Sequence, residues 1–240
     1  MTNSWLSGEL LAFDLETTGV DRFNDVPVSF ALVRFDDGEV IEQVHRLVNP
    51  GRPIPPGAQA VHGISDERAV AEGMAMVDAV ELITAALLDA STREVPLVGF
   101  NLNYDLTMMD ARLRSIDGRG LEERGWNGPV VDPLVLDRHF EKYRKGKKTL
   151  DLVCDEYGVS NAAAHDAAGD AEASARVLLA LSSRHSAVEA ASLAQLMRDQ
   201  VEWHRTWAVS LNQFFLDKGR EPMDERDFDW PIAGQVLSLD

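Results

Sequence analysis

Leu10-Leu-Ala-Phe-Asp-Leu-Glu-Thr-Thr-Gly19 is the stretch from which the rest of this sequence can be interpreted. Its apolar beginning predicts a buried strand, and because side chains alternate along a strand, Asp14 and Glu16 lie on the same face. Two neighbouring carboxylates repel each other, and a cation between them is the simplest way to retain both. The alternative is a strand end whose acids are solvated. A cation site here needs further ligands from elsewhere in the chain.

The composition describes a globular chain with an unusual charge. The chain has 240 residues, of which 45% are hydrophobic, and this length fits one sizeable domain with an extension. The net charge of −17 repels polyanions, so composition alone favours an enzyme acting on small molecules. No segment approaches the roughly 20 apolar residues of a membrane span, and the first nine residues lack a signal-peptide pattern. The single cysteine, Cys154, excludes an internal disulfide and indicates a reducing cytoplasm.

Apolar runs and turn signals predict one mixed sheet flanked by helices. Three strands, at 10–14, 27–35 and 40–48, are expected to form an antiparallel meander, and two short buried strands are expected at 95–100 and 129–132. Capping and helical periodicity predict helices within 76–88, 101–116, 133–143, 149–157, 166–184 and 187–216, with Asn103 and Asp166 as two of the N-caps. Residues 8–184 are expected to form the main domain, and 185–240 a C-terminal helical extension with an acidic tail.

Two more acids follow predicted helix starts. Asp105 is expected in the first turn of a helix after a buried strand, and Asp170 in the first turns of a later helix. His165 precedes Asp170 by five residues, which is about 500° around a helix, so it is expected to come from the preceding loop. Each feature has an ordinary explanation on its own, such as the preference for an acid at the positive end of the helix dipole. Four acids in this order, with a histidine before the last, favour a metal site.

These motifs resemble those of the DnaQ-like, DEDDh-type 3′→5′ exonucleases, over residues 10–184. Phe13-Asp-Leu-Glu-Thr-Thr-Gly19 is similar to the first exonuclease motif, and Asn101 with Tyr104-Asp105 is similar to the second. His165-Asp-Ala-Ala-Gly-Asp170 is similar to the third motif, whose histidine form separates this subgroup from the tyrosine one. Tyr104 stands where phenylalanine is more usual, and we expect this departure to leave the site undisturbed.

The resemblance implies a ribonuclease H-like fold with a five-stranded mixed sheet, three strands antiparallel and two parallel. It implies that two divalent ions, Mg²⁺ or Mn²⁺, are held by four carboxylates, those of Asp14, Glu16, Asp105 and Asp170. It also implies that His165 is the general base that deprotonates the attacking water, so these five residues are the expected catalytic set. The chemistry is consistent, because hard cations prefer carboxylate oxygens and histidine titrates near neutral pH. Four carboxylates and two divalent ions are formally neutral together, so a loaded site can accept a phosphodiester.

Four residues are expected to bind substrate around the terminal nucleotide. Thr17 and Thr18 belong to the first motif, and Asn101 to the second, while His62 lies in Val61-His62-Gly63-Ile64, which is similar to a family turn beside the substrate. For each of the four, the alternative role is ordinary turn chemistry.

Two segments outside the motifs each have two interpretations. Residues 142–148 carry five cations and predict a grip on the strand that leads into the site, or else a solvated loop. In the extension, one helical face carries large apolar side chains, those of Trp203, Trp207, Leu211 and Phe214. That face is expected to pack against the main domain, or alternatively to dock a partner or a second copy of the chain.

The expected function is a metal-dependent 3′→5′ exonuclease that releases nucleoside 5′-monophosphates from the 3′ end of DNA, with RNA as the less favoured substrate. In this it resembles the bacterial DNA polymerase III epsilon-type exonucleases. The alternatives are an exonuclease on RNA or short oligonucleotides similar to RNase T and oligoribonuclease, a hydrolase of mononucleotide derivatives, and a non-catalytic nucleic-acid-binding module. The expected partners are a single-stranded or frayed 3′ end and a DNA polymerase or other recruiting protein, with no membrane. The sequence leaves the oligomeric state open.

Overall fold

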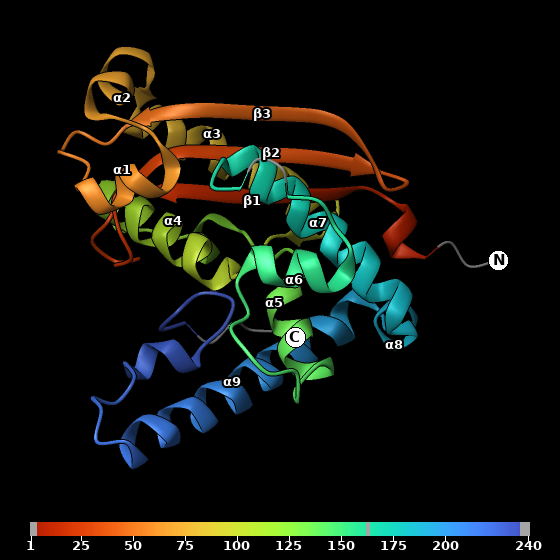
Figure 1. Cartoon of the computed structure of the whole chain (residues 1–240). Coiled ribbons are helices and arrows are strands. Elements are labelled where there is room, and N and C mark those ends of the chain that lie inside the picture. Colours follow the sequence, from red (N-terminus) through yellow and green to blue (C-terminus); the bar gives the residue numbers. More distant parts are fainter. Residues whose placement is uncertain (1–3, 162–163, 236–240) are drawn as a thin grey trace.

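A central sheet organises the chain (Figure 1), and the computed structural model describes residues 4–161 and 164–235. The meander predicted from sequence is confirmed: β1 (Leu10–Thr17), β2 (Pro27–Asp36) and β3 (Glu39–Asn49) pair in antiparallel fashion. β5 (Leu97–Val98) and β6 (Val130–Val131) extend the sheet in parallel on the other side of β1. β1 therefore lies inside the sheet and is buried along most of its length.

The sheet has six strands, in the order β4-β3-β2-β1-β5-β6, and not the five that were expected. The additional strand is β4 (Met74–Ala75), which pairs in parallel with the end of β3. Gly73 permits this pairing, because a side chain at that position would meet the backbone of Asn49 and of Ala69. A two-residue strand that depends on such a close approach has no periodic signal in the sequence.

Helices cover both faces of the sheet (Figure 1). The helices of the main body are α1 (Pro56–His62), α2 (Asp66–Glu72), α3 (Met76–Thr92), α4 (Leu102–Asp117), α5 (Pro133–Phe140), α6 (Leu150–Tyr157) and α7 (Ala167–Arg184). Short 3₁₀ turns occur at Trp5–Ser7, Glu122–Arg124 and Glu225–Phe228. Leu11, Phe13 and Leu15 of β1 pack with α3 and α4, whereas Leu10 and Ala12 pack with α7. The alternation therefore directs Asp14 and Glu16 toward the face of α7.

Two predictions about helix bounds are corrected by the structure. The prolines of residues 49–56 predict a loop there and residues 61–65 a turn, but residues 56–62 form the helix α1. Pro56 is favourable in the first helical turn, and Gly63, with φ of 70°, ends the helix. The helix expected over 187–216 is two helices, α8 (Ser186–Ala190) and α9 (Leu193–Asp217), and the Ser192 side chain caps the second. Within the described residues, no helix is long and apolar enough to cross a bilayer.

Asn103 is not an N-cap, contrary to expectation. α4 begins at Leu102, and the two amide groups at its start donate to the buried carboxylate of Asp132, from Asn101 and from Leu102, at 3.0 Å each. Asn103 lies within the helix and its amide nitrogen donates to the carbonyls of Asp229 and Pro231. A carboxylate brought from another element has thus replaced the local cap.

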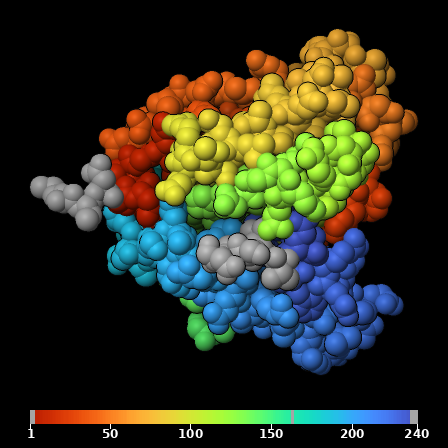
Figure 2. Space-filling model, turned by 180° about the vertical axis from the view of Figure 1, so that it is seen from behind, coloured from red at the N-terminus to blue at the C-terminus, as the bar shows by residue number. Residues whose placement is uncertain are grey.

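The extension shares its core with the main body. Met197, Trp230 and Ile232 belong to the same apolar cluster as β1, α3 and α4. Figure 2 shows the C-terminal segment lying directly against the main body when the molecule is seen from behind. Gln200 of α9 is fully buried: its oxygen accepts from the Asp132 amide at 2.8 Å, and its nitrogen donates to the Val130 carbonyl at 2.8 Å. α9 therefore satisfies the backbone groups of the edge strand β6.

Replacing Gln200 by leucine is expected to lower the free energy of unfolding by about 2–4 kcal/mol, because it leaves two buried backbone groups without partners. Urea denaturation followed by circular dichroism measures the change. Gln213→Leu is the matched control, since Gln213 is exposed on the same helix, and a change within about 0.5 kcal/mol is expected there. Equal stabilities of the two variants would contradict the role assigned to Gln200.

Candidate active site

Three carboxylates meet at the end of β1. Asp14 and Glu16 come from the strand and Asp170 from the first turn of α7, and each offers an oxygen within 4.8 Å of the others. The Asp166 side chain accepts from the amides of Ala168 and Gly169 and so starts α7, which confirms the predicted N-cap. This cap places Asp170 one turn into the helix, facing the strand.

Asp105 lies beside this cluster on the first turn of α4. Its side chain is 4% exposed, and its Oδ1 accepts from the Leu15 amide of β1 at 3.1 Å. The bond ties α4 to the strand between the two acids of the first motif. Asp105 is not among the three residues whose oxygens group together, so the structure places it as a neighbour of the cluster.

The electrostatics of the cluster are unfavourable without a cation. Burial, followed by the charges of Asp105 and Asp170, raises the pKa of Asp14 well above its ordinary value. Burial and the charges of Asp170 and Asp166 raise the pKa of Glu16 to about 8. Burial likewise raises the pKa of Asp105. Carboxylates that are crowded and desolvated in this way gain most from hard cations, so the donor set fits divalent metal ions.

Hydrogen bonds partly offset the rise in the pKa of Asp170. Burial raises its pKa, and the Asn161 amide and the His165 backbone N–H oppose that shift. The Nδ2 of Asn161 donates to Asp170 Oδ1 at 2.9 Å and to Asp151 Oδ1 at 3.0 Å. The sequence reasoning missed Asn161, because it belongs to no recognised motif and reaches the site only through the fold.

His165 lies in the loop before α7, as expected. Its side chain is exposed, its φ is 63°, and its backbone N–H donates to Asp170 Oδ2 at 3.2 Å. This bond fixes the loop against the cluster and leaves the imidazole free at the edge of the site. A histidine in that position can exchange a proton with solvent or substrate.

Thr17 and Thr18 shape the turn that follows β1. The Thr17 hydroxyl donates to the Gly19 carbonyl at 2.7 Å and lies 2.9 Å from the Tyr104 hydroxyl, which also bonds the Gly19 carbonyl. Thr18 is 1% exposed, and its hydroxyl donates to Asp25 at 2.8 Å. Tyr104 therefore supports the turn through its hydroxyl, and the Thr18 side chain is engaged within the turn.

The other two expected substrate residues occupy different environments. His62, at the end of α1, accepts at Nδ1 from the Ile64 amide at 3.1 Å, and its buried Nε2 has no hydrogen-bond partner among the residues that the structure describes. Burial lowers the pKa of His62, and the backbone of Thr17 opposes this, so the ring lies next to the first motif. Asn101 precedes α4 with φ of 68° and an exposed side chain. Asparagine tolerates this left-handed conformation better than most residues.

Asp132 supports the site without belonging to it. It is 1% exposed, burial raises its pKa to about 6, and it caps both α4 and α5. The dipeptide Asp132-Pro133 after an apolar run is a helix-start signal that the sequence offers for α5. Its second role, at α4, depends on a contact between distant segments.

Comparison with known proteins identifies one family. The family model described as Exonuclease (RNase T) matches residues 11–178. DNA polymerase III PolC-type from Lacticaseibacillus paracasei is 30% identical over 198 residues, which are 81% of this chain and 13% of that protein. The chain thus spans about an eighth of that polymerase's length.

Solved structures share the fold. E. coli Exonuclease I in complex with a dA16 oligonucleotide superposes with a TM-score of 0.65 at 21% identity, over 82% of this chain and 44% of that one. Exonuclease X in complex with 5′ overhanging duplex DNA gives a TM-score of 0.56 at 19% identity, over 80% of this chain and 99% of that one. At these identities the similarity concerns the fold.

The raised pKa of Glu16 predicts a pH dependence of stability for the metal-free protein. Between 4.5, the ordinary value, and about 8, the folded chain holds a proton that the unfolded chain has released. The stability of the wild type relative to Glu16→Gln is therefore expected to fall as pH rises through this window. Thermal denaturation of both proteins in EDTA, from pH 5 to 8.5, measures the difference in stability. A difference that stays constant over this range would show that the pKa of Glu16 is not raised.

Proposed function

Because the chain belongs to the exonuclease (RNase T) family, we propose that it is a metal-dependent 3′→5′ exonuclease that releases nucleoside 5′-monophosphates. The observation that carries this proposal is the grouping of Asp14, Glu16 and Asp170 beside Asp105, within the residues that match the family. The relatives identified by sequence include DNA polymerase III PolC-type, which supports DNA as the substrate.

The acidic cluster defines what a cofactor would do. We propose that Asp14, Glu16, Asp105 and Asp170 hold two divalent ions, Mg²⁺ or Mn²⁺. Such ions, when bound, supply the charge that activates water and stabilises a phosphodiester under attack. The carboxylates favour hard cations, since all four offer oxygen donors.

The remaining residues move a proton and hold the substrate end. His165, exposed at the edge of the cluster, accepts the proton of the attacking water at an imidazole nitrogen. Asn161 orients the Asp170 carboxylate. The turn at Thr17 to Gly19, braced by Tyr104, forms a wall for the terminal nucleotide, with His62 and Asn101 at its sides. Thr18 contributes by holding the loop through Asp25.

The charge of −17 favours short or recruited substrates. A single-stranded or frayed 3′ end, delivered by a DNA polymerase or another protein, fits an acidic enzyme better than autonomous binding to long duplex. RNA or short oligonucleotides are the second candidate substrate for the same reason. A single cysteine, Cys154, agrees with a cytoplasmic location.

Digestion of matched DNA and RNA oligonucleotides tests the proposal. One set carries a 5′ label and the other a 3′ label, in single- and double-stranded form, with Mg²⁺ or with Mn²⁺. Stepwise shortening of the 5′-labelled strand with immediate loss of the 3′-labelled nucleotide is expected. Cleavage restricted to a mononucleotide ester would instead identify a hydrolase of nucleotide derivatives, and binding without any cleavage would identify a binding module.

His165→Ala is expected to reduce kcat by about 10²-fold or more, because water loses its proton acceptor. Metal binding, followed by the thermal shift with Mn²⁺, is expected to persist. His185→Gln is the control, since His185 lies beyond the opposite end of α7. Loss of the thermal shift in His165→Ala would mean that the histidine is a metal ligand.

Metal addition at pH 8 is expected to raise the melting temperature. At about 100 times the dissociation constant, bound ions contribute about 2.7 kcal/mol, which corresponds to a shift of about 5–10 °C for a chain of this size. Asp14→Asn is expected to lose most of this shift together with the activity, while the melting temperature of its metal-free form is equal or higher. An undiminished shift in Asp14→Asn would remove Asp14 from the metal site.

A further inference from the structure

A second concave surface lies between α5, the loop that follows it and α9. It is a groove of about 690 Å³. Arg138, His139, Lys142, Gly146 and Lys148 form one wall, and the other wall comes from α9, with Glu202, Trp203, Thr206, Trp207 and Ser210. Neither wall contributes a residue to the acidic cluster. One wall is thus mainly cationic and the other carries two indoles.

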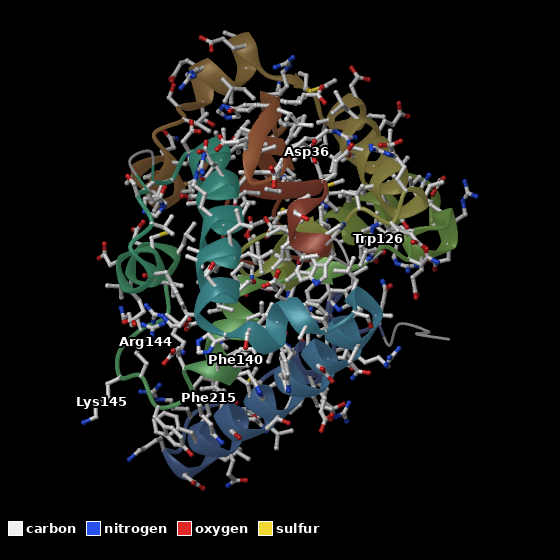
Figure 3. All side chains as sticks on the ribbon, turned by 90° about the vertical axis from the view of Figure 1, so that its right-hand side faces the viewer. Asp36, Trp126, Phe140, Arg144, Lys145 and Phe215 are labelled. Atoms are coloured by element: carbon white, nitrogen blue, oxygen red, sulfur yellow. The ribbon has the colours of Figure 1, made fainter. Side chains whose placement is uncertain are left out.

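The lysines of the chain are concentrated on the loop beside this groove. Four of its five lysines lie in residues 142–148, the fifth being Lys218. Figure 3 shows Arg144 and Lys145 at the edge of the molecule, with Lys145 extending away from the body. A loop of this kind, in a chain with net charge −17, is the natural place for a polyanion to approach.

Two of the loop's cations are structural. The fully buried Asp137 accepts from Arg144 and from Lys148, both at 2.6 Å. These bonds hold the loop against the end of α5 and keep it in place beside α9. Of the five cations in the run that is predicted to grip the strand, Arg144 and Lys148 are therefore engaged within the protein.

The other cations have no carboxylate partner. Among the described residues, Lys142, Lys145 and Lys147 are exposed and form no ion pair. Arg138 forms none either, and its guanidinium carbon lies 3.5 Å from the centre of the Trp207 ring. Burial lowers the pKa of Arg138 to about 10, and the charges of Asp132 and Asp137 oppose this shift. His139 stacks on Trp203 with the ring centres 3.8 Å apart.

The basic loop is followed in sequence by a residue that is linked to the acidic cluster. Asp151 follows Lys148 by three residues, a span of at most about 11 Å between their Cα atoms. Asp151 and Asp170 accept from the same Asn161 amide. Asn161 thus links α6, the helix that follows the cationic loop, to the acidic cluster.

We propose that this groove binds the single-stranded nucleic acid on the 5′ side of the nucleotide that occupies the acidic site. The inference rests on the proposed exonuclease function and extends it. Lys142 and Arg138, which line the groove, contact phosphates there, and the exposed Lys147 of the same loop contacts a phosphate at its edge. Trp207 offers an aromatic surface to a base, and this combination is the one that single-strand binding uses. The extension is then part of the substrate path, because α9 supplies the aromatic wall.

Charge reversal on the loop tests the proposal through binding. Fluorescence anisotropy of a labelled 20-nucleotide single strand in EDTA, where hydrolysis cannot occur, measures Kd for the wild type and for Lys142→Glu/Lys147→Glu. We expect Kd to rise about tenfold at low salt, and the slope of log Kd against log salt to fall by about 1.4, for two lost phosphate contacts. Lys218→Glu/Arg220→Glu is the control with the same change of charge, and its Kd is expected to remain at the wild-type value. Equal effects in the two variants would overturn the proposal.

A second variant addresses the aromatic wall. Trp207→Ala is expected to raise Kd for the strand about tenfold, and Trp207→Phe is expected to restore much of the affinity because it keeps a ring. Identical affinity in Trp207→Ala and the wild type would remove the indole from the binding surface.

Steady-state kinetics distinguish strand binding at the groove from the proposed hydrolysis at the acidic cluster. The p-nitrophenyl ester of thymidine 5′-monophosphate is too small to reach the groove, so Lys142→Glu/Lys147→Glu is expected to hydrolyse it with wild-type kcat and KM, while KM for the 20-nucleotide strand rises. A wild type that cleaves neither substrate would refute the exonuclease function, yet the anisotropy would still test binding at the groove.

If the variant lost affinity for poly-L-glutamate and not for the strand, the groove would bind an acidic peptide and our proposal would be wrong.

Discussion

Repulsion among crowded, partly buried carboxylates at the end of β1 is the constraint on which the rest of the structure depends. No arginine or lysine within the described ranges pairs with Asp14, Glu16, Asp105 or Asp170, and burial raises the pKa of each. Neutral donors hold the acids in place: the Leu15 amide bonds Asp105, and Asn161 bonds Asp170. Such donors orient a carboxylate and leave its charge largely uncompensated, which preserves affinity for a cation. The folded protein therefore gains stability when a metal ion binds to these carboxylates.

The elements that deliver these acids are coupled through buried polar groups. Asp132 caps the helix that carries Asp105, and Gln200 of the extension holds the amide of Asp132. The C-terminal segment is fastened to the same helix through Asn103, whose oxygen also accepts from Arg22 at 2.5 Å. Arg22 lies in the loop that follows the Thr17 turn and pairs with Asp227 of the tail. The extension therefore holds the elements that form the walls of the site, in addition to packing against the main body.

The distribution of charge gives the acidic chain a way to handle a polyanion. Most of the surface repels phosphate, and this repulsion weakens binding anywhere except where cations gather. The loop of residues 142–148 concentrates four of the five lysines, while the buried Asp137 secures two of its cations from below. A favourable patch on a repulsive surface directs a flexible strand to one path, and the path proposed here ends at the acidic cluster.

The sequence by itself determined the parts that depend on local rules. Alternation along one apolar run placed Asp14 and Glu16 on a common face, Asp166 as a cap placed Asp170 one turn into its helix, and the hairpin turn set the meander. These features follow from neighbours in the chain, so a reader of the sequence can find them. Only the tertiary structure decided the sixth strand, the capping of α4 by Asp132 in place of Asn103, and the contact of Asn161 with Asp170. It also decided that Trp207 faces the basic loop. Each of these joins residues from distant segments, and their partners are selected by packing and by the need to satisfy buried polar groups, which leave no periodic signal along the chain.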